Sequence, residues 1–325
     1  MTKVDKKGPE VSVSSHPCHP CSTRYPLLLV HGIGLTHRRH FWGRIPAALQ
    51  AAGADVHLGY TAAWGTVEHN AALLKQQLEQ LLASTDAARI NIIAHSKGGL
   101  DARCLAESLG CAPQIASITT LSTPHAGTKA LDFVLRWFGW VITLIALPFN
   151  GLMHLWGERV SDFATVCAQL STTAMQAFNR ANLPAPEVYY QSYASGLSNL
   201  LSDVTFDFSY LLVKPFDGEN DGLVSPASAP YGEFKGVLRS ATRRGISHRD
   251  IIDLRMKPLG KRAVSGGVAE QGGRGAEGGK GAELAEQGDR TALCGELPLG
   301  PPSLIVTDIV DWHIALVADL KRRGF

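Results

Sequence analysis

Short apolar runs alternate with longer segments of helical periodicity from residue 25 onward. Strands are predicted at residues 26–31, 54–58, 89–94, 115–121 and 188–194, and helices between them at 42–52, 67–82 and 98–109. The strands are apolar at successive positions, which is typical of strands covered on both faces. Alternation of such strands with helices predicts an α/β fold with a mostly parallel central sheet and helices on both faces.

Two of the helices have especially clear apolar stripes. The first follows Thr66, a suitable N-cap, and its stripe consists of Val67, Ala71, Leu74, Leu78, Leu81 and Leu82. The second closes the chain, with apolar residues at Ile305, Ile309, Trp312, Leu316 and Leu320. Each stripe predicts a helix that buries one face.

An apolar insert interrupts this alternation at about residues 131–160. Its centre, Trp137 to Phe149, is nearly uninterrupted apolar sequence of about thirteen residues, whereas a membrane span needs about twenty. Pro148, Asn150 and His154 interrupt any extension. We therefore expect no transmembrane span, but a lid over the active site that contacts a lipid interface transiently; a buried core helix is the alternative.

A second insertion, at about residues 263–302, consists largely of Gly, Ala, Glu and Gln. Such a composition cannot offset its ordering entropy by burial, which predicts a disordered segment. We expect a flexible tail at residues 1–24, followed by one catalytic domain at 25–325 that carries both insertions.

Composition narrows the class of protein. Hydrophobic residues make up 45% and charged residues 18% of the 325 residues, which allows a sizeable core. The net charge of +2 and the lack of a basic stripe argue against a nucleic-acid partner. Residues 1–26 contain no apolar signal-peptide core, which predicts a cytoplasmic protein, with secretion left open. Cys18 and Cys21 form a lone CxxC, which is weak evidence for zinc.

The strongest chemical signal is a small–x–Ser–x–Gly string around Ser96. It follows the 89–94 strand and precedes the 98–109 helix, with Ala94 and Gly98 at the two small positions. This strand-to-helix context is that of a nucleophile elbow, in which a sharp turn raises the serine above the sheet edge. The pattern usually has Gly where this chain has Ala94. The alternative is an ordinary turn with a helix-capping serine.

A glycine-rich turn, His31-Gly32-Ile33-Gly34, follows the first strand. Such a turn lets backbone N–H groups point toward a reacting carbonyl, so we expect the amides of Ile33 and Lys97 to form an oxyanion hole. His31 itself is interpreted as a structural residue.

Together with Ser122–Thr128, these motifs resemble the bacterial triacylglycerol lipase and esterase family, which includes the true lipases of Pseudomonas and Burkholderia. The likeness covers residues 25 to about 260 and the last helix. It implies an α/β-hydrolase fold with a Ser-His-Asp triad in the chain order Ser, Asp, His. The variant with Ala before the elbow also resembles esterases of anaerobic bacteria.

The resemblance implies that Asp221, in Glu219–Val224, is the triad acid. An Asp in a Gly-flanked turn after the 188–194 strand suits this role, and Asp217 is a rival in a similar turn.

The base implied by the resemblance is His248, in the sequence Ser247-His248-Arg249-Asp250. Three other histidines compete. His313 falls within the C-terminal helix, His154 in the apolar insert, and His125 in a loop motif interpreted as structural.

The resembling lipases also hold a structural Ca²⁺ near the catalytic histidine. Asp250 occupies the position of one ligand, and Asp203, with Asp207 as a rival, best matches the other. Two carboxylates with carbonyl and water oxygens would suit this hard cation. No cofactor is required for the chemistry itself.

The sequence therefore predicts a serine carboxylic-ester hydrolase that acts on acylglycerols or other fatty-acyl esters through an acyl-enzyme. Acyl transfer to an alcohol or lipid is the alternative on the same fold. A catalytically silent binding module is a third possibility, but each element of a triad has a candidate here.

Overall fold

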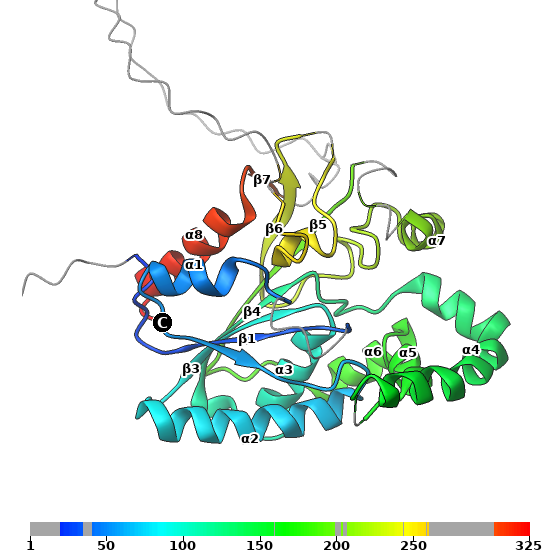
Figure 1. Cartoon of the computed structure of the whole chain (residues 1–325), viewed down its shortest axis with the longest axis horizontal. Coiled ribbons are helices and arrows are strands. Elements are labelled where there is room, and N and C mark those ends of the chain that lie inside the picture. The colour runs from blue at the N-terminus through cyan, green and yellow to red at the C-terminus, as the bar shows by residue number, and fades with distance from the viewer. Residues whose placement is uncertain are drawn as a thin grey trace, which may run out of the picture.

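A computed structural model describes residues 20–34, 41–158, 160–198, 203, 207–242, 244–257, 259 and 302–325. Its centre is one seven-stranded sheet in the order β2-β1-β3-β4-β5-β6-β7, and every adjacent pair is parallel (Figure 1). The strands are β1 (Leu27–Val30), β2 (Val56–Gly59), β3 (Ile90–His95), β4 (Ile115–Leu121), β5 (Tyr189–Ser195), β6 (Glu233–Ser240) and β7 (Ser303–Val306). The predicted fold class is confirmed.

Helices cover both faces of this sheet (Figure 1). They are α1 (Ile45–Ala51), α2 (Val67–Thr85), α3 (Lys97–Glu107), α4 (Lys129–Leu155), α5 (Phe163–Gln169), α6 (Thr172–Ala181), α7 (Asp207–Asp217) and α8 (Ile309–Arg322), with short 3₁₀ turns η1 (Ala112–Gln114) and η3 (Asp250–Ile252).

Alternation of side chains along β1 explains the two-sided core. Leu27 and Leu29 pack with residues of α1 and α8, whereas Leu28 and Val30 pack with residues of α2 and α3. Successive strand residues point to opposite faces, so a strand that is buried on both faces, as β1 is, favours apolar residues at successive positions. This is why the runs in the sequence were continuous rather than alternating.

The predicted N-cap of α2 is confirmed, because Thr66 Oγ1 accepts a hydrogen bond from the His69 amide at 3.3 Å. The chain end differs from expectation. Ile305 lies in β7, and the last helix begins at Ile309 after the cap Asp308. The spacing of Ile305 and Ile309 resembled a helix, but β7 is an edge strand with Ile305 exposed on its outer side. The preceding strand, β6, carries charges at alternate positions and was not predicted.

The packed structure begins before residue 25. Cys21 is fully buried in the core on the α1–α8 side, and its amide donates to the Ala52 carbonyl at 3.0 Å. The Arg24 amide donates to the carbonyl of Phe325, so the two ends of the described chain meet. Cys18 and nearly all of the predicted 263–302 insertion lie outside the described residues.

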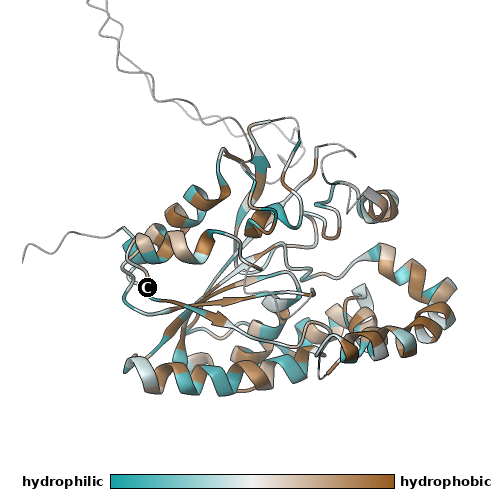
Figure 2. Cartoon of the chain, viewed as in Figure 1, coloured by the Kyte–Doolittle hydropathy of each residue, from teal (hydrophilic) through white to brown (hydrophobic). Residues whose placement is uncertain are grey.

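Helix α4 lies to one side of the sheet, packed against α5, α6 and α7 (Figure 1). It is apolar around most of its circumference, unlike the amphipathic α2 (Figure 2), and it is kinked at Phe138. Only Ala130, Ala146 and Met153 are buried along its length. The alternative of a buried core helix is therefore wrong for this insert.

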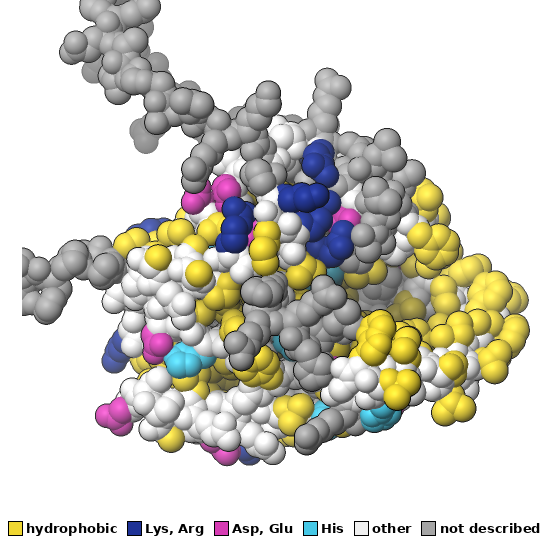
Figure 3. Space-filling view, in the orientation of Figure 1, with side chains coloured by type: hydrophobic (Ala, Val, Ile, Leu, Met, Phe, Trp, Pro, Cys, Tyr) yellow, Lys and Arg dark blue, Asp and Glu magenta, His cyan; other side chains and the backbone are white. Residues whose placement is uncertain are grey.

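The outer side of α4 forms an apolar surface, seen at the right of Figure 3. Trp137 is 60% exposed, Trp140 70% and Leu147 81%. Among the described residues, α4 alone has the length and composition that a bilayer-crossing helix needs, a criterion that core helices and signal sequences also meet.

Candidate active site

Ser96 lies on the sharp turn between β3 and α3. Its backbone has φ 54° and ψ −133°, a conformation that L residues with a side chain rarely adopt. Such strain persists only where surrounding contacts enforce it, and it is the signature of a nucleophile elbow. Ser96 is buried but retains 8% exposure.

The residues around this turn have to be small. A Cβ on Gly32 would lie 2.6 Å from Ser96 Cβ, and a Cβ on Gly98 would lie 2.3 Å from the His31 carbonyl oxygen. Real Cβ atoms do not approach that closely, so the glycine-rich turn after β1 and the start of α3 are fitted to each other. The two glycine motifs of the sequence are thus one packed unit.

Asp221 and His248 are brought together from two loops that follow β5 and β6. Their side chains are joined by a 2.9 Å hydrogen bond between His248 Nδ1 and Asp221 Oδ2. The backbone repeats the connection, because the His248 amide donates to the Asp221 carbonyl at 2.9 Å. Both residues are buried, with Asp221 at 0% exposure. The remaining ring nitrogen of His248 is then the one suited to proton transfer.

The surroundings of Asp221 keep it ionised. Burial by itself would raise the pKa of this carboxyl, but the charge and hydrogen bond of His248 and the Val224 amide outweigh it and hold the pKa below its usual value. Ser195 donates to Asp221 Oδ2 at 3.0 Å, and the Leu223 and Val224 amides donate to Oδ1 at 3.1 and 2.9 Å. An ionised, fully bonded carboxylate can hold the imidazole tautomer and stabilise an imidazolium.

The ring of His95, which precedes Ser96, lies against His248 with a centroid distance of 4.4 Å. Complete burial, followed by the nearby charge of His248, lowers the pKa of His95 well below its usual value. His95 is therefore neutral near pH 7, and it contacts His248 without opposing a positive charge there. This contact places the His248 ring against the residue that precedes Ser96.

The amides of Ile33 and Lys97 border the same turn. Lys97 is the first residue of α3, whose opening N–H groups have no partner within the helix. Ile33 follows Gly32, which packs directly on Ser96. Both residues expected to donate to an oxyanion therefore flank Ser96, Lys97 in the chain and Ile33 through the packing of Gly32.

Only the backbone amide of Lys97 is considered as a donor, because its side chain is engaged elsewhere. It is buried and pairs with Asp101 at 2.7 Å, and Asn70 donates to the other oxygen of Asp101 at 2.9 Å. Complete burial raises the pKa of Asp101 to about 6, against the opposing effect of Lys97. The Asn70–Asp101 hydrogen bond therefore connects the first turn of α2 to α3.

The rival candidates have other partners. Asp217 accepts hydrogen bonds from the Lys129 and Ala130 amides at 3.3 and 3.2 Å, and so holds the start of α4. His125 lies between Thr120 and Arg103, and His313 donates to the Ile309 carbonyl at 2.8 Å inside the α8 packing. His154 is exposed near the end of α4.

His31 is structural, as interpreted from the sequence: Nδ1 lies 2.8 Å from the Gly32 carbonyl and Nε2 accepts from the Thr61 amide at 3.3 Å. The side chain of Asp207 lies outside the described residues.

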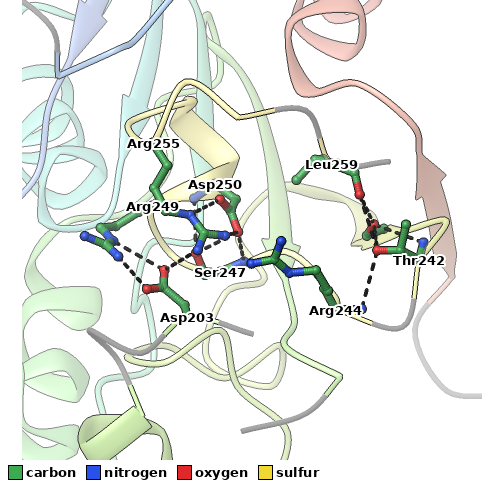
Figure 4. Close-up of polar contacts among 9 residues, drawn as sticks. Asp203, Thr242, Arg244, Ser247, Arg249, Asp250, Arg255 and Leu259 are labelled. Atoms are coloured by element: carbon green, nitrogen blue, oxygen red, sulfur yellow. Dashed lines mark hydrogen bonds and ion pairs between the residues drawn. The ribbon is translucent and has the colours of Figure 1, made fainter. Parts of the chain in front are cut away.

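Asp203 and Asp250, predicted as calcium ligands, do lie near each other, but arginines contact both (Figure 4). Arg249 and Arg255 contact Asp203, and Arg255 Nε donates to Asp250 Oδ1 at 2.7 Å. Within the part of the chain that the structure describes, no group of three or more His, Cys, Asp or Glu is arranged to hold a metal ion.

Sequence reasoning missed two kinds of residue here. Ser195, at the end of β5, carries no local signal for its hydrogen bond to Asp221, because only the sheet brings them together. Arg249 and Arg255 did carry a signal, because two positively charged side chains close to Asp250 in the sequence argue against a bound cation there.

Comparisons with known proteins identify the family and the fold of this chain. A family model described as "Domain of unknown function (DUF7379)" matches residues 6–179. Triacylglycerol lipase 2 of Saccharomyces cerevisiae is 30% identical over 225 residues, which cover 67% of this chain and 63% of that protein. A triacylglycerol lipase of Burkholderia plantarii is 39% identical over 180 residues, 50% of this chain and 49% of its own length.

Solved structures share the fold. The Bacillus licheniformis lipase BlEst2 in mature form has a TM-score of 0.56 at 21% identity, covering 74% of this chain and 91% of that one. The metagenomic carboxyl esterase MGS0156 has a TM-score of 0.53 at 18% identity, and the match covers 71% of this chain and 66% of that one. The matched region spans 63%, 55% and 49% of the first three curated relatives.

Proposed function

We propose, from the premise that this chain belongs to the DUF7379 family and to the lipases and esterases, that it hydrolyses carboxylic esters through a serine nucleophile. One observation carries the proposal: the 2.9 Å bond between His248 Nδ1 and the ionised Asp221, beside a serine held at positive φ. That combination supports Ser96 as the nucleophile, His248 as its general base and Asp221 as the carboxylate that orients the base.

The chemistry follows from these groups. Ser96 Oγ attacks the acyl carbonyl carbon, and His248 Nε2 takes the proton. The Ile33 and Lys97 amides donate to the oxyanion that forms. His248 then returns the proton to the departing alcohol, leaving an acyl-Ser96 ester. Water, deprotonated by His248, hydrolyses that ester and regenerates the enzyme.

We further propose that the substrates are fatty-acyl esters presented by a lipid surface, and that α4 is the element that meets this surface. Several relatives are named triacylglycerol lipases, and the exposed Trp137 and Trp140 would enter a lipid interface at low cost. Aromatic side chains with a polar ring nitrogen favour that boundary. A helix lying in the interface needs no span across the bilayer.

The test is a series of p-nitrophenyl esters from acetate to palmitate, assayed with the wild type and Ser96→Ala. We expect hydrolysis by the wild type and a loss on the order of 10³-fold or more in the variant. The matched control is Ser108→Ala at the other end of α3, where the hydroxyl donates to Asn182. A Ser96→Ala enzyme that keeps tenths of the activity would contradict the proposal.

A further inference from the structure

The guanidinium of Arg255 contacts two carboxylates that come from different segments of the chain (Figure 4). Its Nε and Nη2 both donate to Asp250, with 2.7 Å from Nε to Oδ1, and its Nη1 lies 3.8 Å from Asp203 Oδ2. Asp203 is also contacted through two nitrogens of Arg249. Two aspartates and two arginines therefore form one compact ionic cluster.

The cluster is largely withdrawn from water. The Asp203 and Asp250 side chains are 1% and 4% exposed, and the Arg255 side chain is 18% exposed. Buried carboxylates without cations would be strongly destabilising, so at least one positive group is required between them. Burial tends to raise the pKa of Asp203, but its bonds to Arg249 and Ser247 and the charge of Arg255 lower it overall. Asp203 therefore stays ionised.

The cluster is connected directly to the catalytic histidine. Asp250 Oδ2 accepts from the Ser247 amide at 3.1 Å and from the Ser247 hydroxyl at 2.9 Å. Ser247 precedes His248 in the chain, and the Asp250 amide donates back to the Ser247 carbonyl at 2.9 Å. A cation that holds Asp250 thus holds the turn on which the His248 ring is mounted.

These residues do not fit the calcium site that the resemblance implied. Ca²⁺ takes six to eight oxygen ligands, whereas the carboxylate oxygens here already face guanidinium N–H groups. A divalent cation at the same place would meet the positive charge of Arg255. The charge that the two aspartates require is already present in the chain.

We propose that Arg255 is a positioning residue that replaces a metal ion: its guanidinium bridges Asp203 and Asp250 and keeps His248 in line with Ser96. This inference rests on the proposed function for the role of His248. The bidentate bond to Asp250 fixes direction as well as charge, which a lysine ammonium does less well. Because this cation is covalently attached, chelators cannot remove it.

The experiment uses the full chain, dialysed against EGTA, with melting temperature, kcat and KM measured for the wild type, Arg255→Ala and Arg255→Lys. The wild type should respond neither to EGTA nor to added Ca²⁺. Arg255→Ala should lose kcat by about 10- to 100-fold with little change in KM, as for other groups that orient a catalytic residue. Arg255→Lys should keep part of the kcat.

Chemical rescue separates positioning from general destabilisation. Guanidinium chloride, far below unfolding concentrations, should raise the kcat and melting temperature of Arg255→Ala, whereas NaCl at equal ionic strength should not. Arg322→Ala removes an exposed pair with Asp319 on α8 and should leave kcat unchanged. If Arg255→Ala does not fold, Arg255→Gln takes its place in the rescue.

Three results would overturn the proposal: a Ca²⁺-dependent rise in the wild-type melting temperature or kcat, an Arg255→Ala enzyme with wild-type kcat, or equal rescue by NaCl and guanidinium. The melting-temperature measurements with EGTA, Ca²⁺ and guanidinium do not depend on catalytic activity. They therefore test the bridge even if Ser96→Ala shows that another residue is the nucleophile.

Discussion

At the scale of single residues, the site depends on contacts that enforce an unfavourable backbone. A non-glycine residue in the conformation of Ser96 costs on the order of 1–3 kcal/mol. The turn is held because the Ser96 amide donates to the Leu121 carbonyl at 2.9 Å and Thr123 Oγ1 donates to the Ser96 carbonyl at 2.8 Å. Leu121 is the last residue of β4, and Thr123 lies in the loop that follows it. The strain is thus balanced by the neighbouring strand rather than by the local sequence.

The first prediction concerns the coupling of nucleophile and base. His248→Asn should lower kcat by a factor similar to that of Ser96→Ala, on the order of 10³-fold or more, and the double variant should be little worse than either. The reason is that the two side chains act in one proton transfer. Burst and steady-state kinetics with one soluble ester measure this, and circular dichroism checks the fold. Multiplicative losses would show that the two residues act independently.

A second prediction addresses the orienting carboxylate. Asp221→Asn keeps the side-chain shape but removes the charge and allows the wrong imidazole tautomer, so kcat should fall on the order of 10³- to 10⁴-fold near pH 7. The control is Asp217→Asn, which changes a carboxylate that caps α4 instead. A larger loss of kcat in Asp217→Asn would move the triad acid to that residue.

At the scale of elements, α4 has two different sides. Its inner side makes aromatic contacts with the domain. The ring centroid of Phe149 lies 4.9 Å from that of Trp64 and 4.6 Å from that of Phe163. The ring centroid of Phe133 lies 5.0 Å from that of Phe216 in α7. Its outer side exposes Trp137 and Trp140. Aromatic pairs of this kind hold the insert onto the domain, and they leave the outer side exposed.

This division gives the third prediction. Replacing Trp137 and Trp140 by Ser should lower the hydrolysis of long-chain emulsions by about tenfold or more while soluble short esters are affected little, because only the emulsion requires interfacial contact. Leu183→Ser, at an apolar position 70% exposed outside α4, is the control and should change neither rate. Phe149→Ser should instead lower the melting temperature. Equal losses on all chain lengths would contradict a lipid-contacting role.

At the scale of the whole molecule, the C-terminal helix α8 covers one face of the sheet and places a histidine in the core of the protein. His313 is completely buried, and its ring meets Trp42 at 6.3 Å in an edge-on contact. Burial lowers the pKa of His313 to about 4. The ring is therefore neutral in the folded protein at pH values where it would be protonated in the unfolded chain, whose ordinary pKa is about 6.5.

The fourth prediction follows from that difference. The unfolded chain binds a proton at His313 below pH 6.5, but the folded protein does so only near pH 4, so stability falls as pH falls through this window. Denaturant unfolding of the wild type should lose roughly 3 kcal/mol more between pH 6.5 and 4 than that of His313→Asn. Esterase activity of the variant near pH 8 should remain close to wild type. Parallel pH curves would contradict the linkage, and an inactive, folded variant would identify His313 as the base.

The local sequence determined the elements that depend on near neighbours. Mainly apolar runs predicted five of the parallel strands, because burial on both faces favours apolar residues at successive positions. The order strand, small residue, Ser96, Gly98, helix predicted the elbow, because only small residues permit that close approach. The exposed β7 and the charged β6 were not predictable in this way, since their pairing, not their pattern, makes them strands.

What the sequence could not decide was which groups far apart in the chain become neighbours. Asp221 and His248 were implied by resemblance, but their 2.9 Å bond depends on β5 and β6 ending side by side at one edge of the sheet. The same edge brings Asp203 to Asp250 and sets Arg255 between them. A sequence lists carboxylates and cations without their distances, and electrostatic partners are chosen by distance and burial. The tertiary structure therefore decided that the histidine loop is tied by the chain's own guanidinium groups.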